Sequence, residues 1–309
     1  MFSKIVSSGV AARDQLVYGN LISNLQTPEE AKEKVFYSDF PVLVSRFGNV
    51  EFLAFREVFD IKRKLTFKER FMLACHGSRL SGVREKTAIK LRTNAGVFSA
   101  RSNAEFERFF DEYYYCVPEI DFFFRWFSGD ALLCKAGLDA SVGQLEYLNI
   151  LQYPSFYKGV FENKRLLVIS PHVNSIEHQV KNSYAALCNH LGVSSFSVST
   201  IKTFHHVLGG AGDWFVELER LKTEIRNYKD TVDYVILGCG AYGLPLGAYA
   251  KGIGLSALHL GGVTQLLFGI MGERWNDMLD AGTSSDFWIR PLASDRPKGA
   301  ELIEGGCYW

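Results

Sequence analysis

Short apolar runs alternate along the chain with longer segments in which apolar residues recur at helical spacing. Five runs predict strands, at residues 40–45, 164–170, 195–199, 232–237 and 256–260. Helices are predicted at residues 1–36, 52–59, 67–93, 103–115, 214–228 and 246–251, and between the strand at 164–170 and Gly192. This alternation predicts an α/β fold of Rossmann-like type, with a mostly parallel sheet and helices on both of its faces.

Aromatic residues are concentrated in a region that interrupts the alternation, at about residues 60–160. The region contains the predicted helices at 67–93 and 103–115 and a short predicted strand at 96–99. We interpret it as an α-helical, aromatic-rich insertion. No repeat, low-complexity tract or Pro/Gly/Ser-rich linker divides the 309 residues, so we expect a single domain over residues 1–309.

A glycine-rich loop follows the predicted strand at 232–237 and matches the pattern G-x-G-x-x-G. Pro245 lies where the next helix would take its first turn. Loops at the carboxyl ends of parallel strands bind ligands, and backbone N–H groups at a helix start bind phosphate. The residues expected to face a phosphate-bearing donor are Gly238, Gly240, Ala241, Tyr242, Gly243 and, in the loop after the next strand, Gly262.

Two other interpretations of this loop stay open. A nicotinamide-binding unit would end its second strand with Asp or Glu for the ribose, whereas this strand runs into His259 and Leu260. An NAD-dependent oxidoreductase using residues 238–243 is therefore an alternative with less support. The glycines could also serve only the close packing of strand and helix.

Polar residues at a strand-to-helix turn form a second candidate site. Arg46, Asn49 and Glu51 come directly after the predicted strand at 40–45. Like the glycine loop, this turn would lie at the carboxyl edge of the sheet. A structural role for Glu51, complementing the helix dipole, is the competing interpretation.

Candidates for a general acid or base follow other strands. His172 and Glu177 open the segment after the strand at 164–170, and both residue types transfer protons. Asp213 precedes the helix at 214–228, where a role as helix cap would alone explain it. For His172, a buried imidazole with a structural role is equally open.

Composition excludes several classes of protein. The net charge is zero, so we expect no bulk electrostatic binding to nucleic acid. The six cysteines are scattered without a C-x-x-C pair, which is typical of a reducing compartment. We find no apolar core of a signal peptide and no run long enough for a membrane span. We expect a cytoplasmic protein, and association with the inner membrane face stays open.

The last residues of the sequence are unusual for a chain end. Residues 305–309 read Gly-Gly-Cys-Tyr-Trp, whereas frayed ends are normally polar. We expect this stretch to pack back onto the body, close to the site.

The turn after the first strand resembles a known motif. The GT-D-fold glycosyltransferases, a bacterial family, carry R-F-G-D-G-E after their first strand, and this chain has Arg46-Phe47-Gly48-Asn49-Val50-Glu51. The sequences at 238–243, 260–262 and 268–275 are also similar to proteins of sugar-polymer gene clusters of this type. The resemblance covers roughly residues 40–55 and 230–275.

The resemblance implies a glycosyltransferase that moves a sugar from an activated diphosphate donor to a glycan or lipid-linked acceptor in surface polysaccharide biosynthesis. A nucleotide-sugar would be the donor. The family's Asp-x-Glu pair is implicated in binding a divalent metal and the donor diphosphate, and it corresponds to Asn49 and Glu51. Asn49 keeps a carbonyl oxygen for Mn²⁺ or Mg²⁺ but loses a charge. Without metal, Arg46, Lys202 and backbone N–H groups would hold the diphosphate.

The expected donor site therefore includes Arg46, Gly48, Asn49 and Lys202 beside the glycine loop. The catalytic groups are expected among Glu51, Glu177, His172 and Asp213. Asn49 also leaves open a phosphoribosyl diphosphate donor, or a non-catalytic protein that binds nucleotides or glycans.

Overall fold

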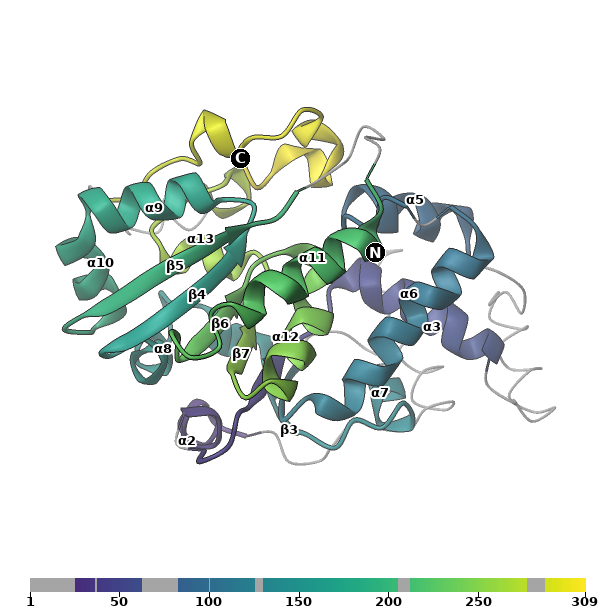
Figure 1. Cartoon of the computed structure of the whole chain (residues 1–309), viewed down its shortest axis with the longest axis horizontal. Coiled ribbons are helices and arrows are strands. Elements are labelled where there is room, and N and C mark those ends of the chain that lie inside the picture. Colours follow the sequence, from purple (N-terminus) through teal and green to yellow (C-terminus); the bar gives the residue numbers. More distant parts are fainter. Residues whose placement is uncertain are drawn as a thin grey trace, which may run out of the picture.

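One parallel sheet organises the molecule (Figure 1). The computed structural model describes residues 26–36, 38–62, 83–99, 101–125, 130–204, 212–276 and 287–309. Seven strands lie in the order β3-β2-β1-β7-β6-β4-β5, and every neighbouring pair is parallel. They are β1 (Leu43–Ser45), β2 (Phe122–Arg125), β3 (Ser141–Gln144), β4 (Lys164–Ser170), β5 (Phe196–Lys202), β6 (Tyr234–Leu237) and β7 (Ser256–His259). The Rossmann-like α/β fold and all five strands predicted by the main pattern are confirmed.

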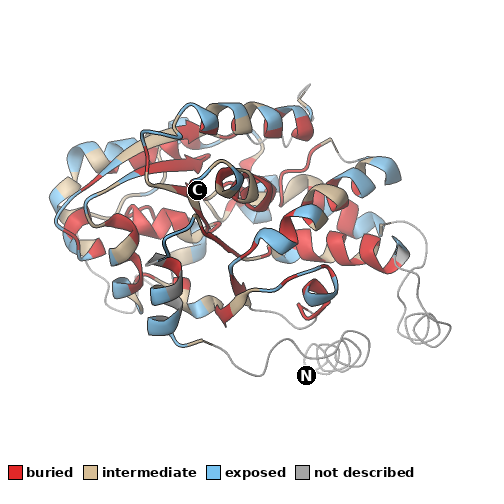
Figure 2. Ribbon diagram, turned by 60° about the horizontal axis from the view of Figure 1, so that its bottom comes forward, coloured by how far each residue is buried: buried red, intermediate tan, exposed pale blue. Residues whose placement is uncertain are grey.

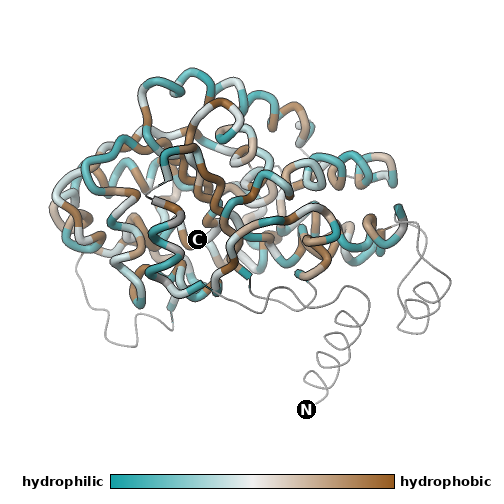
Figure 3. Tube along the Cα trace, turned by 90° about the horizontal axis from the view of Figure 1, so that it is seen from below, coloured by the Kyte–Doolittle hydropathy of each residue, from teal (hydrophilic) through white to brown (hydrophobic). Residues whose placement is uncertain are grey.

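Both faces of the sheet are buried, because successive side chains of each strand point to opposite sides. In β4, Leu167 and Ile169 join one hydrophobic core while Leu166 and Val168 join the other. The strands form the buried and hydrophobic centre of the molecule (Figures 2 and 3). Continuous apolar runs therefore marked the central strands correctly, whereas β5, at the sheet edge, has partly exposed residues such as Ser197.

Helices cover both faces, as the alternating pattern predicts. One face is covered by α3 (Asn49–Lys62), α5 (Glu85–Thr93), α6 (Asn103–Cys116), α11 (Trp214–Arg226) and α12 (Gly243–Gly252). The other is covered by α2 (Pro28–Phe36), α8 (Pro154–Phe161), α9 (Val173–Asn182), α10 (Tyr184–Leu191) and α13 (Val263–Leu267). The short helix α7 (Leu132–Lys135) follows β2.

Local signals fix where several helices begin. Ser102 and Glu105 form a capping box at the start of α6, with Glu105 N donating to Ser102 Oγ and Ser102 N to Glu105 Oε2. Asp213 caps α11 by accepting from Phe215 N at 2.7 Å. The cap role that the sequence offered for Asp213 is confirmed.

The region at 60–160 is less uniform than the sequence suggests. It does supply an aromatic-rich helical cluster, in which Phe110 of α6 packs 4.7 Å from Phe55 between ring centroids. It also supplies β2 and β3, which extend the main sheet beyond β1. Residues 96–99 form a turn and not the expected strand. Thus only part of this region is a helical addition to the sheet.

Residues 287–309 run back across the molecule beside α9 (yellow in Figure 1). Ile289 and Ile270 form a short parallel bridge. The rest consists of short 3-10 turns, η5 (Ala293–Asp295), η6 (Ala300–Leu302) and η7 (Glu304–Gly306). Among the described residues, no helix is long and apolar enough to cross a membrane.

Candidate functional site

A cavity opens where β1 and β7 end. The chain leaves β1 toward the α12 side of the sheet, where Phe47 and Val50 are buried, and leaves β7 toward the α9 side, where Leu260 and Leu266 are buried. Neighbouring parallel strands whose connections diverge in this way leave a crevice that binds ligands. The cavity there has a volume of about 480 Å³, which is within the usual range for small-molecule sites.

Distant parts of the chain supply the charge of the cavity. Among the described residues its charged lining comes from the turn after β1, from α3 and α5, from η4 (Glu273–Trp275) and from η7; these residues are Arg46, Glu51, Lys90, Arg274 and Glu304. Three cationic side chains thus face two carboxyl groups. Such a surface suits a ligand with more than one negative charge.

Arg46 lies directly against the loop after β7. A Cβ placed on Gly261 would fall 2.0 Å from Arg46 Nη2, and Gly261 has a φ of +61°. Only glycine meets both conditions, so the loop is shaped around the guanidinium. Arg46 Nε is buried and has no hydrogen-bond partner within the described ranges.

A second arginine lies against the next glycine of the same loop. A Cβ on Gly262 would fall 3.1 Å from Arg274 Nη1. The Arg274 guanidinium also lies 4.7 Å from the Tyr308 ring and 5.0 Å from the Trp275 ring, which is cation–π distance. The two consecutive glycines therefore each have an arginine beside them.

Glu51 is packed onto the turn that the resemblance singled out. It lies in the first turn of α3, and a Cβ on Gly48 would fall 2.1 Å from Glu51 Oε2. Burial raises the pKa of Glu51, while its own backbone N–H and Arg46 act to lower it, and Glu304 acts to raise it. Asn49, at the start of α3, is exposed on the cavity wall. The structure thus brings Arg46, Gly48, Asn49 and Glu51 together.

The glycine loop contributes only its first part to the cavity. Gly238 and Gly240 line it, whereas Ala241, Tyr242 and Gly243 are buried behind it. Gly240 has a φ of +59° and its missing Cβ would meet Ala95 O at 3.0 Å. The expected role of the last three residues in donor binding is not supported, because the loop turns into the core after Gly240.

Those three residues have structural contacts. Tyr113 OH donates to Ala241 O at 2.8 Å, and Tyr242 stacks on Trp214 with ring centroids 5.1 Å apart. Gly243 gives room to His259, whose Cδ2 would lie 2.2 Å from a Cβ there. Within the G-x-G-x-x-G pattern, Gly238 and Gly240 therefore line the cavity, while Gly243 gives room for packing.

His259, the last residue of β7, is buried and is not part of the cavity lining. Its Nδ1 lies 3.1 Å from Ser45 Oγ, with both groups buried. Burial, with the charge of Arg46 acting in the same direction, lowers the pKa of His259 to about 3, so the imidazole is neutral. The contact between His259 and Ser45 links the ends of β7 and β1. A nicotinamide site would need a carboxylate at the end of β7, where this chain has His259.

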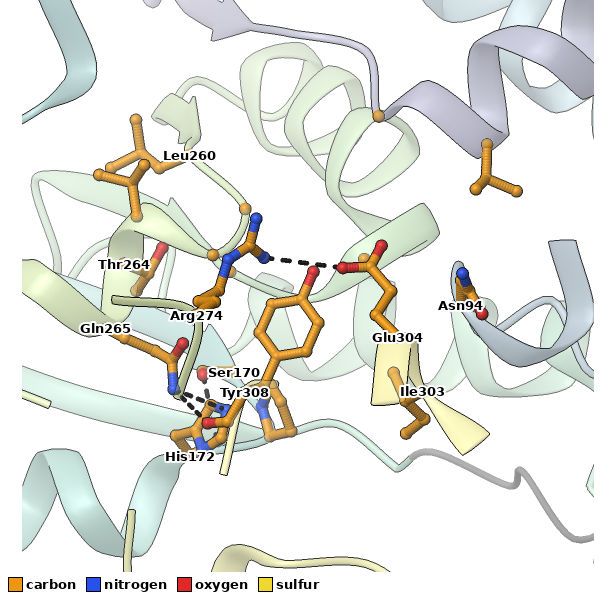
Figure 4. Close-up of a pocket in the computed structure, with 18 of the residues that line it drawn as sticks. Asn94, Ser170, His172, Leu260, Thr264, Gln265, Arg274, Ile303, Glu304 and Tyr308 are labelled. Carbon is orange, nitrogen blue, oxygen red and sulfur yellow. Dashed lines mark hydrogen bonds and ion pairs between the residues drawn. The ribbon is translucent and has the colours of Figure 1, made fainter. Parts of the chain in front are cut away.

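His172 also lines the cavity, and Figure 4 shows it beside Gln265 and Tyr308. Its Nε2 is 3.3 Å from Gln265 Nε2, which also donates to Tyr308 O at 2.8 Å. The imidazole packs against Trp309 with ring centroids 5.4 Å apart, and His172 is only 3% exposed. His172 is therefore part of the cavity wall, held by neighbours that also line it.

Three expected site residues lie elsewhere. Glu177 is exposed on α9 and accepts from Thr200 Oγ1 at 2.5 Å. Asp213 is used as the cap of α11. Lys202 Nζ contacts Asp295 Oδ1 at 3.4 Å. These three side chains are not part of the cavity lining, because a residue near a strand end can still face away from the crevice.

The expectation that residues 305–309 pack beside the site is confirmed. Tyr308 and Trp309 line the cavity together with Ile303 and Glu304. The segment is anchored by Asp295, which is 4% exposed and accepts from Ser175 N and Ser175 Oγ, each at 2.7 Å. Trp309 Nε1 donates to Asp295 O at 3.1 Å.

Several lining residues escaped the sequence analysis. Arg274 and Glu304 lie far from the strand-end motifs along the chain and reach the cavity through tertiary packing, whereas Gln265 follows the strand-end loop at Gly262 by three residues. Lys90 belongs to a helix whose basic residues are typical of a solvent-exposed face. The aromatic stretch near the end and the 268–275 similarity were the only signals that pointed to this wall.

The described residues of the cavity offer few ligands for a divalent metal. Within the described ranges, no group of three or more His, Cys, Asp or Glu residues could hold a metal ion. Glu51 is buried beside Arg46 with a raised pKa, which disfavours the ionised form that a metal binds. We derive no step through a metal, and the role of Asn49 and Glu51 as metal ligands stays a prediction.

Comparison with known proteins adds no relative to this description: no protein-family model, curated protein or solved structure matches the chain.

Proposed function

We propose that this protein is a glycosyltransferase that binds the diphosphate of an activated sugar donor in the cavity at the carboxyl edge of the sheet. The observation that supports it is the arginine pair. Arg46 and Arg274 lie against Gly261 and Gly262 respectively, so two guanidinium groups flank one stretch of strand-end backbone. Guanidinium groups bind phosphate oxygens with two parallel hydrogen bonds.

The charges of the cavity suit the leaving group of such a reaction. When the bond to the sugar breaks, negative charge develops on the diphosphate, and preorganised cations stabilise it. Arg46, Lys90 and Arg274 would supply that stabilisation. The turn at Arg46 is also the part of the chain that resembles the GT-D-fold glycosyltransferases.

Glu51 would act as a neutral acid. Its raised pKa favours the protonated carboxyl, and a protonated carboxyl donates a hydrogen bond to a phosphate oxygen, whereas a carboxylate would repel it. In this proposal Asn49 adds a polar contact at the cavity wall. The acceptor would be a glycan or a lipid-linked sugar, as the resemblance implies, in a cytoplasmic setting.

A donor panel tests the proposal. The purified protein is incubated with uridine, guanosine and thymidine diphosphate sugars and with phosphoribosyl diphosphate, using methyl glycosides as acceptors, and released diphosphate is measured. We expect turnover of at least one donor, and loss of that turnover in Arg46→Gln. Binding of a donor without turnover would instead favour a non-catalytic binding protein.

The same assay tests the metal. Arg46, Lys90 and Arg274 line the cavity, and we propose that these cations hold the diphosphate without metal, so we expect turnover to persist in EDTA and to change little across a Mn²⁺ titration. Turnover that EDTA abolishes and Mn²⁺ restores would show that the donor phosphates complete a metal site with Glu51.

A further inference from the structure

Resting on the proposed function, we infer that Glu304 is the general base that takes the proton from the acceptor hydroxyl. The sequence placed the base among Glu177, His172 and Asp213. Glu304 lies outside every motif that the sequence singled out, and four features of its surroundings support the assignment.

The first feature is its position. Glu304 lines the cavity, and in Figure 4 its side chain extends into the space between Arg274 and Asn94. The side chain is 36% exposed, so its carboxylate meets the solvent of the cavity and not the core. An acceptor entering from solvent can therefore reach it.

The second feature is the backbone. Glu304 has a φ of +48°, and Gly305 and Gly306 follow with +71° and +81°. A left-handed conformation is unfavourable for a residue with a Cβ, and residues held in this way cluster at functional sites. Hydrogen bonds hold the turn in place, including Gly306 N to Ile303 O at 2.9 Å and Arg274 N to Cys307 O at 2.9 Å.

The third feature is a weak ion pair. Glu304 Oε2 lies 3.9 Å from Arg274 Nη1, and both side chains are about one-third exposed. At that distance and exposure the pair contributes little. The diphosphate of a donor would compete for Arg274, and its binding would leave the Glu304 carboxylate free for the acceptor.

The fourth feature is that the other candidate carboxyl groups are unsuited to act as the general base. Glu177 and Asp213 face away from the cavity, and each has a structural contact. Glu51 is 8% exposed and its raised pKa favours the protonated form, so it serves better as a donor of a hydrogen bond. Glu304 is thus the cavity carboxylate that is open to solvent.

The reaction step is a direct displacement. The acceptor oxygen forms a bond to the anomeric carbon as the bond from that carbon to the donor's phosphate oxygen breaks. The electron pair of the broken bond leaves with the diphosphate, which Arg46 and Arg274 stabilise. The hydroxyl proton moves to Glu304. A single displacement of this kind inverts the anomeric centre.

The test compares Glu304→Gln and Glu304→Gly with Glu301→Gln on the donor that the wild-type protein turns over. Glu301 is an exposed glutamate of the same segment and serves as the matched control. Glycine accepts the left-handed backbone, so Glu304→Gly keeps the fold. For Glu304→Gln we expect kcat to fall by about 10²–10⁴-fold with the donor KM little changed, and Glu301→Gln to match wild type.

Added formate should then restore part of the turnover of Glu304→Gly, because a small carboxylate can occupy the space of the lost side chain. Formate should not accelerate the wild-type protein. Rescue identifies proton transfer, which a purely structural role would not show.

Each alternative outcome is distinct. If kcat of Glu304→Gln stays near wild type, or if only the donor KM rises, Glu304 is not the base and at most positions Arg274. A loss of kcat with no formate rescue of Glu304→Gly would also overturn the inference. If the wild-type protein turns over no donor, the proposed function fails first and takes this inference with it.

Discussion

At the scale of single residues, the site depends on glycines that give room to charged side chains. Gly48 lies beneath Glu51, and Gly261 lies against Arg46. The sequence marked Gly48 only through a resemblance, and it could not show why a side chain is excluded there. The reason is contact: the space of the missing Cβ is filled by the carboxylate.

Gly48→Ala tests this contact. The added Cβ would fall 2.1 Å from Glu51 Oε2, so the carboxyl must turn away, and we expect turnover to drop by roughly tenfold or more. The unfolding free energy should fall by about 1–3 kcal/mol. The control is Gly252→Ala, where nothing lies within 4 Å of the new Cβ. Equal turnover in the two variants would show that the position of Glu51 does not matter.

The pH dependence of stability tests the state of Glu51. Its pKa is raised above the ordinary value of 4.5, so the unfolded chain loses this proton at a lower pH than the folded protein. The wild-type protein therefore loses stability as pH rises from about 4.5 through the folded pKa. Glu51→Gln lacks this loss, so we expect its advantage in urea unfolding to grow above pH 4.5. A pH-independent difference would contradict a raised pKa.

At the scale of elements, α9 and the segment 287–309 form one unit. The buried carboxylate of Asp295 satisfies backbone and side-chain donors at the start of α9, where the helix dipole favours negative charge. Lys202, expected at the donor, contacts Asp295. The sequence could not predict this, because nothing local links residue 202 to residue 295.

Asp295→Asn should therefore loosen the cavity wall. We expect an unfolding free energy about 1–3 kcal/mol lower in urea titrations, since charged hydrogen bonds in the interior are lost, and weaker donor binding. Asp233→Asn is the comparison: Asp233 pairs with Arg165 at the surface and should cost at most about 1 kcal/mol. Similar losses in both variants would mean that Asp295 is not an anchor.

At the scale of the whole molecule, the apolar runs predicted the central strands well because these strands are buried on both faces. The sequence did not predict β2 and β3, which lie in the region interpreted as a helical insertion. The turns at Arg46, Gly238 and Gly261 also lie at the predicted carboxyl edge of the sheet, since all strands of a parallel sheet end at the same edge. The sequence did not predict which way the individual side chains face. Glu177 and Asp213 lie near strand ends but face outward, and Arg274 and Glu304 reach the cavity only through packing that no short pattern encodes.

The central claim is that Arg46 and Arg274 bind a diphosphate at this edge. Calorimetric titration with pyrophosphate and with orthophosphate tests it most directly, using the wild-type protein, Arg46→Gln, Arg274→Gln and, as control, Arg165→Gln, which alters an exposed arginine at the start of β4. We predict that pyrophosphate binds more tightly than orthophosphate. Each cavity arginine removed should weaken pyrophosphate binding by about tenfold or more, and Arg165→Gln should leave it unchanged. Equal pyrophosphate affinity in all four proteins would contradict the account.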